Sequence, residues 1–170
     1  MYAADITRTF PVSGKFSDEQ LAIYKVVLDA MNAAIDMVKP GNHIMQPQEI
    51  SEKVITKGLV KLGLLDGDPE ELHKSGAYKE FYMHKIGHWL GLDVHDAGDY
   101  VEGEEYMKFK PGMITTIEPG IYISSSMDVD DKWKGIGIRI EDDILVTKDG
   151  NENLTKKVPS DPEEIESLMS

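Results

Sequence analysis

Two stretches of the chain decide its fold: MITTIEPGIYI at residues 113–123 and IGIRIEDDILVT at residues 136–147. Both are rich in Ile and Thr and alternate in places, a pattern that predicts β-strands. Successive side chains of a strand point to opposite faces, so Arg139 and Glu141 share one face of the second strand. An acidic side chain inside an apolar strand needs a partner or a metal ion if it is buried, which makes Glu118 a candidate functional residue.

Helical patterns precede these strands. Ser17 is a good N-cap with Gln20 at the N3 position of a capping box, and an apolar stripe follows until residues 39–41 (Lys-Pro-Gly) end the helix. A second helix is predicted over residues 47–63 and a third, shorter one from residue 69 to about residue 82. Helices followed by strands indicate an α+β fold rather than alternating βαβ units.

The composition excludes several classes of protein. The 170 residues, 41% of them hydrophobic, suffice for one domain with a sizeable core. No run of about 18 apolar residues predicts a membrane span, and the N-terminus has no secretory signal pattern. The net charge of −13 argues against a nucleic-acid partner. The chain has no cysteine, which excludes disulfides and thiolate zinc sites, and a reducing cytoplasm is the default location.

Four residues spread along the chain form a candidate metal site: Asp5 in DITRTFP, His88 in GHWLGLDVH, Glu118 in TTIEPGIYI and Glu141 in GIRIEDDI. Three of them also have a simpler interpretation. Asp5 can cap a turn in the strand-and-loop segment predicted over residues 5–12, His88 can be a core histidine, and Glu141 opens an acidic triplet that a solvated turn would explain. One imidazole with several carboxylates suits Mn, Co or Fe. Two such ions can share a hydroxide that attacks a carbonyl, although four ligands are few for two ions.

A zinc-peptidase helix motif is the alternative for the histidines, because His84 and His88 have the i, i+4 spacing of H-E-x-x-H. Lys85 stands where that motif needs its glutamate, so the general base is missing. Gly87 and Gly91 also disfavour a stable helix. We therefore reject this motif.

The chain resembles the pita-bread metallopeptidases, and among them the Xaa-Pro aminopeptidases (aminopeptidase P family). The matching segments are DITRTFPVSGKFSDEQ, MHKIGHWLGLDVHD, KPGMITTIEPGIYI and KGIGIRIEDDILVTKDGNENLT, which occur in order from about Ala4 to the end of the chain. The resemblance implies a curved, mostly antiparallel sheet with helices on its outer face. It also implies a hydrolase that removes the N-terminal residue of a peptide whose second residue is proline.

The resemblance further implies a metal centre with two divalent ions, foremost Mn. By position, Asp5 and Glu141 would bridge the ions, and His88 and Glu118 would ligate one of them. A metal-activated hydroxide would attack the peptide carbonyl, with Glu118 as proton shuttle to the leaving proline nitrogen.

Three further residues have roles by the same resemblance. His95 would hydrogen-bond the carbonyl oxygen as negative charge develops. His84 would line the pocket near the proline, and Arg139 would orient an acidic ligand or neighbour.

One departure from the family pattern concerns the second ion. The family places another aspartate upstream of DITRTFP, whereas only four residues precede Asp5 here. We therefore expect residues 1–170 to be the C-terminal portion of a catalytic domain, without the N-terminal domain and the first part of the catalytic domain. One ion held by Asp5, His88, Glu118 and Glu141 is expected, with a weak or empty second position. An unpaired sheet edge predicts marginal stability of the isolated chain and weak or no activity.

Two other functions stay open. Prolidase, which splits Xaa-Pro dipeptides, shares the fold and the ligands, whereas the HWLGLDVHD segment favours the aminopeptidase. A non-catalytic pita-bread binding module is the alternative of another class, although such relatives usually lose their ligands. For the full-length protein the resemblance implies a homo-oligomer.

Overall fold

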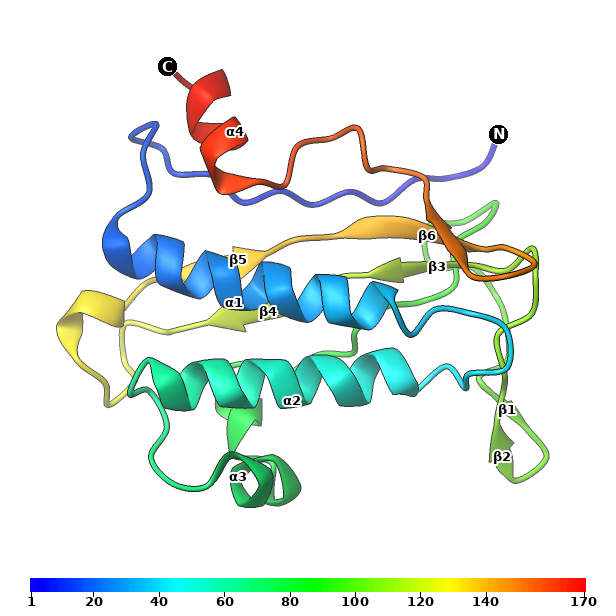
Figure 1. Cartoon of the computed structure of the whole chain (residues 1–170), viewed down its shortest axis with the longest axis horizontal. Coiled ribbons are helices and arrows are strands. Elements are labelled where there is room, and N and C mark those ends of the chain that lie inside the picture. Colours follow the sequence, from blue (N-terminus) through cyan, green and yellow to red (C-terminus); the bar gives the residue numbers. More distant parts are fainter.

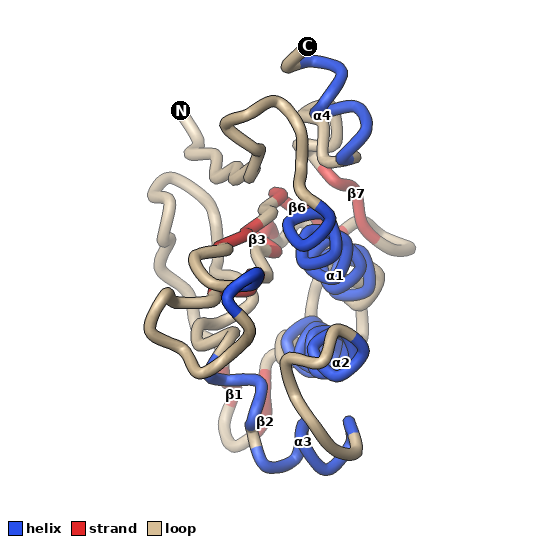
Figure 2. Tube along the Cα trace, turned by 90° about the vertical axis from the view of Figure 1, so that its left-hand side faces the viewer, coloured by secondary structure: helices blue, strands red, loops and turns tan.

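Helices from the first half of the chain cover one face of the strands from the second half (Figures 1 and 2). The computed structural model describes all residues, 1–170. Its helices are α1 (Asp18–Ile35), α2 (Gln46–Lys61), α3 (Pro69–Ser75), α4 (Pro162–Leu168) and the 3-10 helices η1 (Ala77–Glu80) and η2 (Asp131–Trp133). Its strands are β1 (Val101–Glu102), β2 (Glu105–Tyr106), β3 (Ile114–Ile117), β4 (Gly120–Tyr122), β5 (Gly137–Arg139), β6 (Asp142–Val146) and β7 (Asn151–Asn153). All strand pairs are antiparallel: β1 with β2, β3 with β6, β6 with β7, and β4 with β5.

The two stretches that predict strands each form two strands with one shared break. Residues 113–123 give β3 and β4, and residues 136–147 give β5 and β6. The β3–β6 and β4–β5 pairs have the same register, so Glu118 lies opposite Glu141 where the regular pairing is interrupted. Pro119 lacks the N–H that regular pairing requires, which explains the interruption. The break therefore places two acidic residues face to face.

The capping box predicted at the start of the first helix is present, with the Ser17 side chain accepting from the Gln20 amide and the Gln20 side chain accepting from Ser17. The helix ends at Ile35, a turn earlier than the sequence pattern predicts. α2 lies where the second helix is predicted. None of the helices combines the length and apolar character that crossing a bilayer requires.

Two predicted elements are wrong. The single helix from residue 69 to about residue 82 is divided, because Gly76 adopts a left-handed conformation (φ 76°) that ends α3 before η1 begins. The strand predicted within residues 5–12 is reduced to one bridge between Thr7 and Glu141. Proline and glycine follow closely in this segment and prevent a longer ladder.

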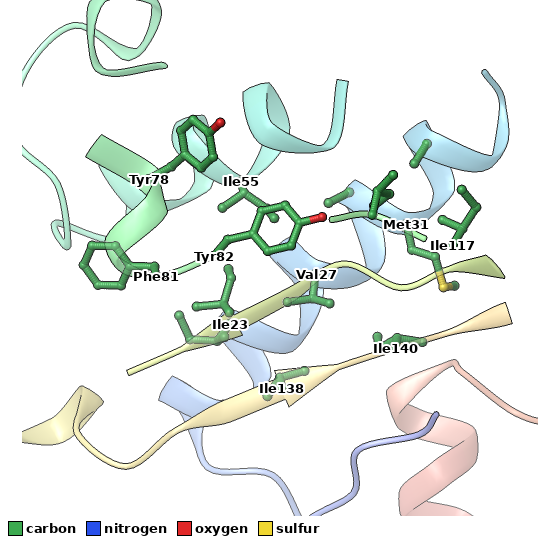
Figure 3. Close-up of a cluster of buried hydrophobic side chains, with 14 of the residues drawn as sticks. Ile23, Val27, Met31, Ile55, Tyr78, Phe81, Tyr82, Ile117, Ile138 and Ile140 are labelled. Carbon is green, nitrogen blue, oxygen red and sulfur yellow. The ribbon is translucent and has the colours of Figure 1, made fainter. Parts of the chain in front are cut away.

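The core lies between α1, α2 and the inward face of the strands (Figure 3). Ile138 and Ile140 alternate with Arg139 and Glu141, and both isoleucines are buried against the helices, as the alternation predicts. Side chains of α1, α2 and the segment before residue 83 complete this cluster: Ile23, Val27, Met31, Ile55, Tyr78, Phe81 and Tyr82. The alternate strand positions, which include Glu118, consequently face away from the helices.

Candidate metal centre

An extended segment, residues 86–90, places His88 beside β3. The Glu118 amide donates to the Ile86 carbonyl at 2.7 Å, and the Thr116 amide donates to the His88 carbonyl at 3.0 Å. This antiparallel spacing brings His88 opposite Thr116, two residues from Glu118 along the same face. The histidine therefore reaches the site from an extended strand-like segment, not from the helix that a zinc-peptidase motif needs.

The N-terminal segment pairs at Glu141, along the edge of that strand opposite to β3 and β4, and its side chains reach the same face of the sheet. The Glu141 amide donates to the Thr7 carbonyl at 3.0 Å, and the Asp5 amide donates to the Asp143 carboxylate at 3.2 Å. Thr7 also donates its hydroxyl to Glu141 Oε2. These contacts bring Asp5, 136 residues away in sequence, next to Glu141.

The structure brings together all four residues predicted as metal ligands. His88 Nε2 lies 3.4 Å from Asp5 Oδ2 and 3.5 Å from Glu118 Oε1. Potential ligand atoms of His88, Glu118 and Glu141 all lie within 4.8 Å of one another, and so do those of Asp5, His88 and His95. The rings of His88 and His95 meet edge to face at 4.3 Å between centroids. His95 therefore lies close enough to act beside the four.

Two buried polar atoms of this cluster have no hydrogen-bond partner, His88 Nε2 and Glu141 Oε1. His88 Nδ1 lies 3.0 Å from the Trp89 carbonyl, which can only accept, so Nδ1 donates and Nε2 is the nitrogen that a neutral ring offers to a metal ion. Buried polar atoms without partners are costly and rare, whereas an imidazole nitrogen and carboxylate oxygens are ligands for a divalent cation. The donor set thus fits such an ion.

Two carboxylates of the site, Glu118 and Glu141, have raised pKa values. Burial raises the pKa of Glu118, against the opposing effects of His88 and Arg139, whose Nη1 lies 3.9 Å from Glu118 Oε2. Burial also raises the pKa of Glu141, and the nearby charges of Glu118 and Asp5 add to this, while the Thr7 hydrogen bond opposes it. A cation among them would reverse these shifts, because it favours the charged carboxylates.

The other predicted site residues line an open pocket of about 420 Å³ next to the cluster. Its walls are formed by His84, Lys85, Gly87, His88, His95, Tyr100, Glu118 and Arg139. His84 Nε2 lies 2.9 Å from the Tyr122 hydroxyl, within hydrogen-bond distance. The catalytic candidates Glu118, His95, His84 and Arg139 thus share one pocket.

Sequence reasoning missed three residues that support the site: Thr7, Asp143 and Tyr122. Asp143 is buried, accepts from the Asp5 amide, and has its pKa raised by burial. Alternation could have found all three, because Thr7 follows Asp5 and Asp143 follows Glu141 at the two-residue period of a strand face. Tyr122 lies two such periods after Glu118. Buried Glu141, Asp142 and Asp143 also exclude a solvated acidic turn.

Comparison with known proteins gives consistent matches. The model of metallopeptidase family M24 matches residues 1–148. The chain is 52% identical to the Xaa-Pro aminopeptidase of Haemophilus influenzae over 100% of its own length and 39% of that protein. The structure of Pseudomonas aeruginosa aminopeptidase PepP matches with a TM-score of 0.98 and 56% identity, over 99% of this chain and 38% of that one. Escherichia coli aminopeptidase P with the inhibitor Pro-Leu matches with a TM-score of 0.94 and 49% identity, over 99% of this chain and 38% of that one.

Proposed function

The chain belongs to metallopeptidase family M24 and has the pita-bread fold of its solved relatives, and on this premise we propose that it serves a proline-specific aminopeptidase. Its reaction would remove the N-terminal residue of a peptide with proline in second position. The main observation in support is that Asp5, His88, Glu118 and Glu141 lie close together. Two buried atoms of this cluster, His88 Nε2 and Glu141 Oε1, have no hydrogen-bond partner. The names of the relatives and the Pro-Leu inhibitor of the E. coli enzyme support the choice of substrate.

A divalent ion, foremost Mn, would be held by Asp5, His88, Glu118 and Glu141. Such an ion supplies Lewis acidity and lowers the pKa of a coordinated water. Mn is proposed because carboxylates dominate the donor set. We propose one firmly bound ion per chain with a weak or empty second position, and metal quantification after dialysis that finds two firmly held ions would contradict this.

The protein's own groups would then bind the substrate and move protons. The pKa of Glu118 is raised by burial, so this carboxylate is suited to take up a proton and pass it to the leaving proline nitrogen. His95, at the edge of the pocket, would donate to the carbonyl oxygen as charge develops. Arg139 lies within 3.9 Å of Glu118 and would hold that carboxylate in place.

The chain covers 38–39% of the length of the relatives described above, so the activity of the whole protein is part of the proposal. We propose that residues 1–170 are the C-terminal portion of the catalytic domain and that the full-length protein is a homo-oligomer. The cytoplasmic location stays a prediction.

The test is a peptidase assay with added Mn on a peptide that begins Xaa-Pro and on an Xaa-Pro dipeptide. Cleavage of the longer peptide is expected from a full-length protein that carries residues 5–141, with weak or no cleavage by the isolated chain. In the full-length protein Glu118→Gln should abolish cleavage, while Lys134→Gln, whose partner Asp131 is on the surface, should not. Cleavage of the dipeptide alone would favour prolidase instead. A non-catalytic module would be favoured by a different result. In that case this chain, and a full-length relative that carries its residues 5–141, would bind Mn firmly but cleave neither substrate.

A further inference from the structure

One lysine and one arginine line the pocket beside the metal centre, and only the arginine has an acidic partner. The guanidinium of Arg139 lies 3.9 Å from the Glu118 carboxylate. Lys85 forms no ion pair, although the chain has 31 acidic residues and only 18 lysines and arginines. A lysine without a counter-charge in the wall of a pocket is available to an anionic group of a ligand.

Hydrogen bonds on both sides fix the backbone that carries Lys85. The Lys85 carbonyl accepts from His84 Nδ1 at 2.8 Å, and the next amide, that of Ile86, donates to Gln48 Oε1 at 2.5 Å. Ile86 is buried, whereas the Lys85 side chain is exposed. The lysine side chain therefore extends from a fixed point to the place where the pocket meets solvent.

An aromatic ring holds the charged end of Lys85 at the pocket. Its ammonium lies 5.6 Å from the centroid of the Tyr100 ring, within the range of a cation–π interaction. Trp89 fixes Tyr100 in turn, because the two rings stack at 5.5 Å between centroids and the Trp89 amide donates to the Tyr100 hydroxyl at 3.2 Å. That hydroxyl keeps its own proton to donate. An anion in the pocket thus has two possible partners on one wall, an ammonium and a hydroxyl.

The charges of the site favour one direction for a bound peptide. Asp5 and Glu141 belong to the metal centre and do not line the pocket, whereas Lys85 does. The amino terminus of a peptide is a cation, which the acidic centre attracts and Lys85 repels. The part of the peptide that begins with proline would therefore extend past Lys85, and a carboxylate in that part would be attracted.

We infer, resting on the proposed function, that Lys85 is a specificity-determining residue that binds a carboxylate of the substrate on the leaving side of the scissile bond. This carboxylate is either the side chain of an acidic residue after the proline or the C-terminus of a short peptide. Lys85 would contact the anion without touching the reacting atoms, so it would change substrate affinity and leave the chemical step unchanged. The preferred substrates would then be short or acidic peptides with proline in second position.

The first experiment measures binding by calorimetry, on the Mn-loaded full-length protein that carries residues 5–141. The probes begin with proline and imitate the leaving part of a substrate, as does the Pro-Leu inhibitor of the E. coli relative. They are Pro-Glu amide, with a side-chain carboxylate, Pro-Gln, with a terminal carboxylate, and Pro-Gln amide, with neither. At least one charged probe should bind about threefold more tightly than Pro-Gln amide, the strength of an exposed ion pair, and the tighter probe identifies the source of the carboxylate.

Variants show whether Lys85 causes this preference. Lys85→Gln should remove it, Lys85→Arg should keep it, and higher ionic strength should weaken it in the wild type. Lys132→Gln is the matched control, because Lys132 also lies over an aromatic ring, that of Trp133 at 5.3 Å, but outside the pocket. Equal affinities for the three probes in the wild type would overturn the inference. So would a preference that persists in Lys85→Gln, since the carboxylate would then bind the metal ion instead.

The second experiment separates this role from the proposed function, by the cleavage of Xaa-Pro-Glu amide and Xaa-Pro-Gln amide by the full-length protein. In Lys85→Gln the KM for the acidic peptide should rise about threefold with kcat unchanged, and the neutral peptide should be cleaved as before. An equal loss for the two peptides would overturn the specificity role. If the wild type cleaves neither peptide, the proposed function fails, while the binding constants still decide what Lys85 does.

Discussion

The guanidinium of Arg8 lies 2.7 Å from the carboxylate of Asp142, and this ion pair fastens the N-terminal segment to β6. Both side chains are largely buried, with 11% and 2% of their surface exposed. Arg8 also donates to the Glu141 carbonyl at 2.7 Å and to the Pro159 carbonyl at 2.8 Å. The Arg8–Asp142 pair lies on the face of the sheet opposite to the metal centre. Because Asp5 and Thr7 belong to the same segment as Arg8, the pair holds these two residues of the candidate site in place.

Removing one partner of this pair should therefore cost stability and metal affinity together. Arg8→Met leaves Asp142 buried without its counter-charge, and we expect the free energy of unfolding to fall by about 3 kcal/mol. Chemical denaturation measures this, and Mn titration should show weaker binding. Lys134→Met is the matched control, because Lys134 and Asp131 form a pair of the same 2.7 Å length on the surface. Equal losses in the two variants would refute the role given to burial.

Gly87 allows the segment that carries His88 to approach β3. A Cβ there would lie 1.9 Å from the Thr116 carbonyl oxygen, a backbone atom that cannot move without breaking the strand. Gly87→Ala should therefore unfold the site, with a loss of more than about 3 kcal/mol in stability and of Mn binding. Gly150→Ala is the control, since nothing lies within 4 Å of its Cβ position. Thermal denaturation with and without Mn distinguishes them, and a fully stable Gly87→Ala would contradict the packing argument.

The sequence was sufficient for much of the site because strand alternation is a local property. Glu118, Arg139 and Glu141 could be placed on strand faces from the period of two alone, and the structure puts them on one face. Asp5 and His88 were candidate ligands from their residue types and motifs, and the family resemblance gave them positions at the metal ions. Their proximity depends on pairing between distant segments. Local patterns contain no information on such pairing.

The failures have physical causes of the same kind. Gly76 lies inside the third predicted helix, and only the folded chain shows that its left-handed conformation ends α3. The break opposite Pro119 could not be placed either, because it depends on the register between β3 and β6. Sequence reasoning also missed Arg8, because its role depends on an ion pair with buried Asp142, 134 residues away.

The raised pKa of Glu141 predicts how the stability of the metal-free chain depends on pH. A carboxyl whose folded pKa exceeds its ordinary value of 4.5 binds protons more readily in the folded state, so its contribution to stability falls as pH rises through the interval between the two values. Glu141→Gln removes that titration. With chelator present, the variant should be more stable than the wild type at pH 7, and the difference should shrink toward pH 4. With Mn present the wild type should be the more stable protein, because the variant loses a ligand. A wild type that is more stable than the variant at pH 7 without metal would contradict this prediction.

Gln48 links the helical layer to the metal centre, and this link gives the last prediction. From α2, its Oε1 accepts from the Ile86 amide at 2.5 Å, and the Ile86 carbonyl in turn accepts from the Glu118 amide. Gln48→Leu leaves the Ile86 N–H buried without a partner, a cost of about 1–3 kcal/mol. Amide exchange should accelerate at Ile86 and Glu118, and Mn affinity should fall.

Gln46→Leu is the matched control for this link, because Gln46 also accepts a backbone N–H, that of His43, at 2.8 Å but outside the site. That variant should speed exchange at His43 and leave Mn affinity unchanged, since no residue of the metal centre depends on the Gln46 hydrogen bond. Gln48→Leu could instead leave amide exchange at Glu118 slow and Mn still bound. The pairing between β3 and residues 86–90 would then hold Glu118 without help from α2.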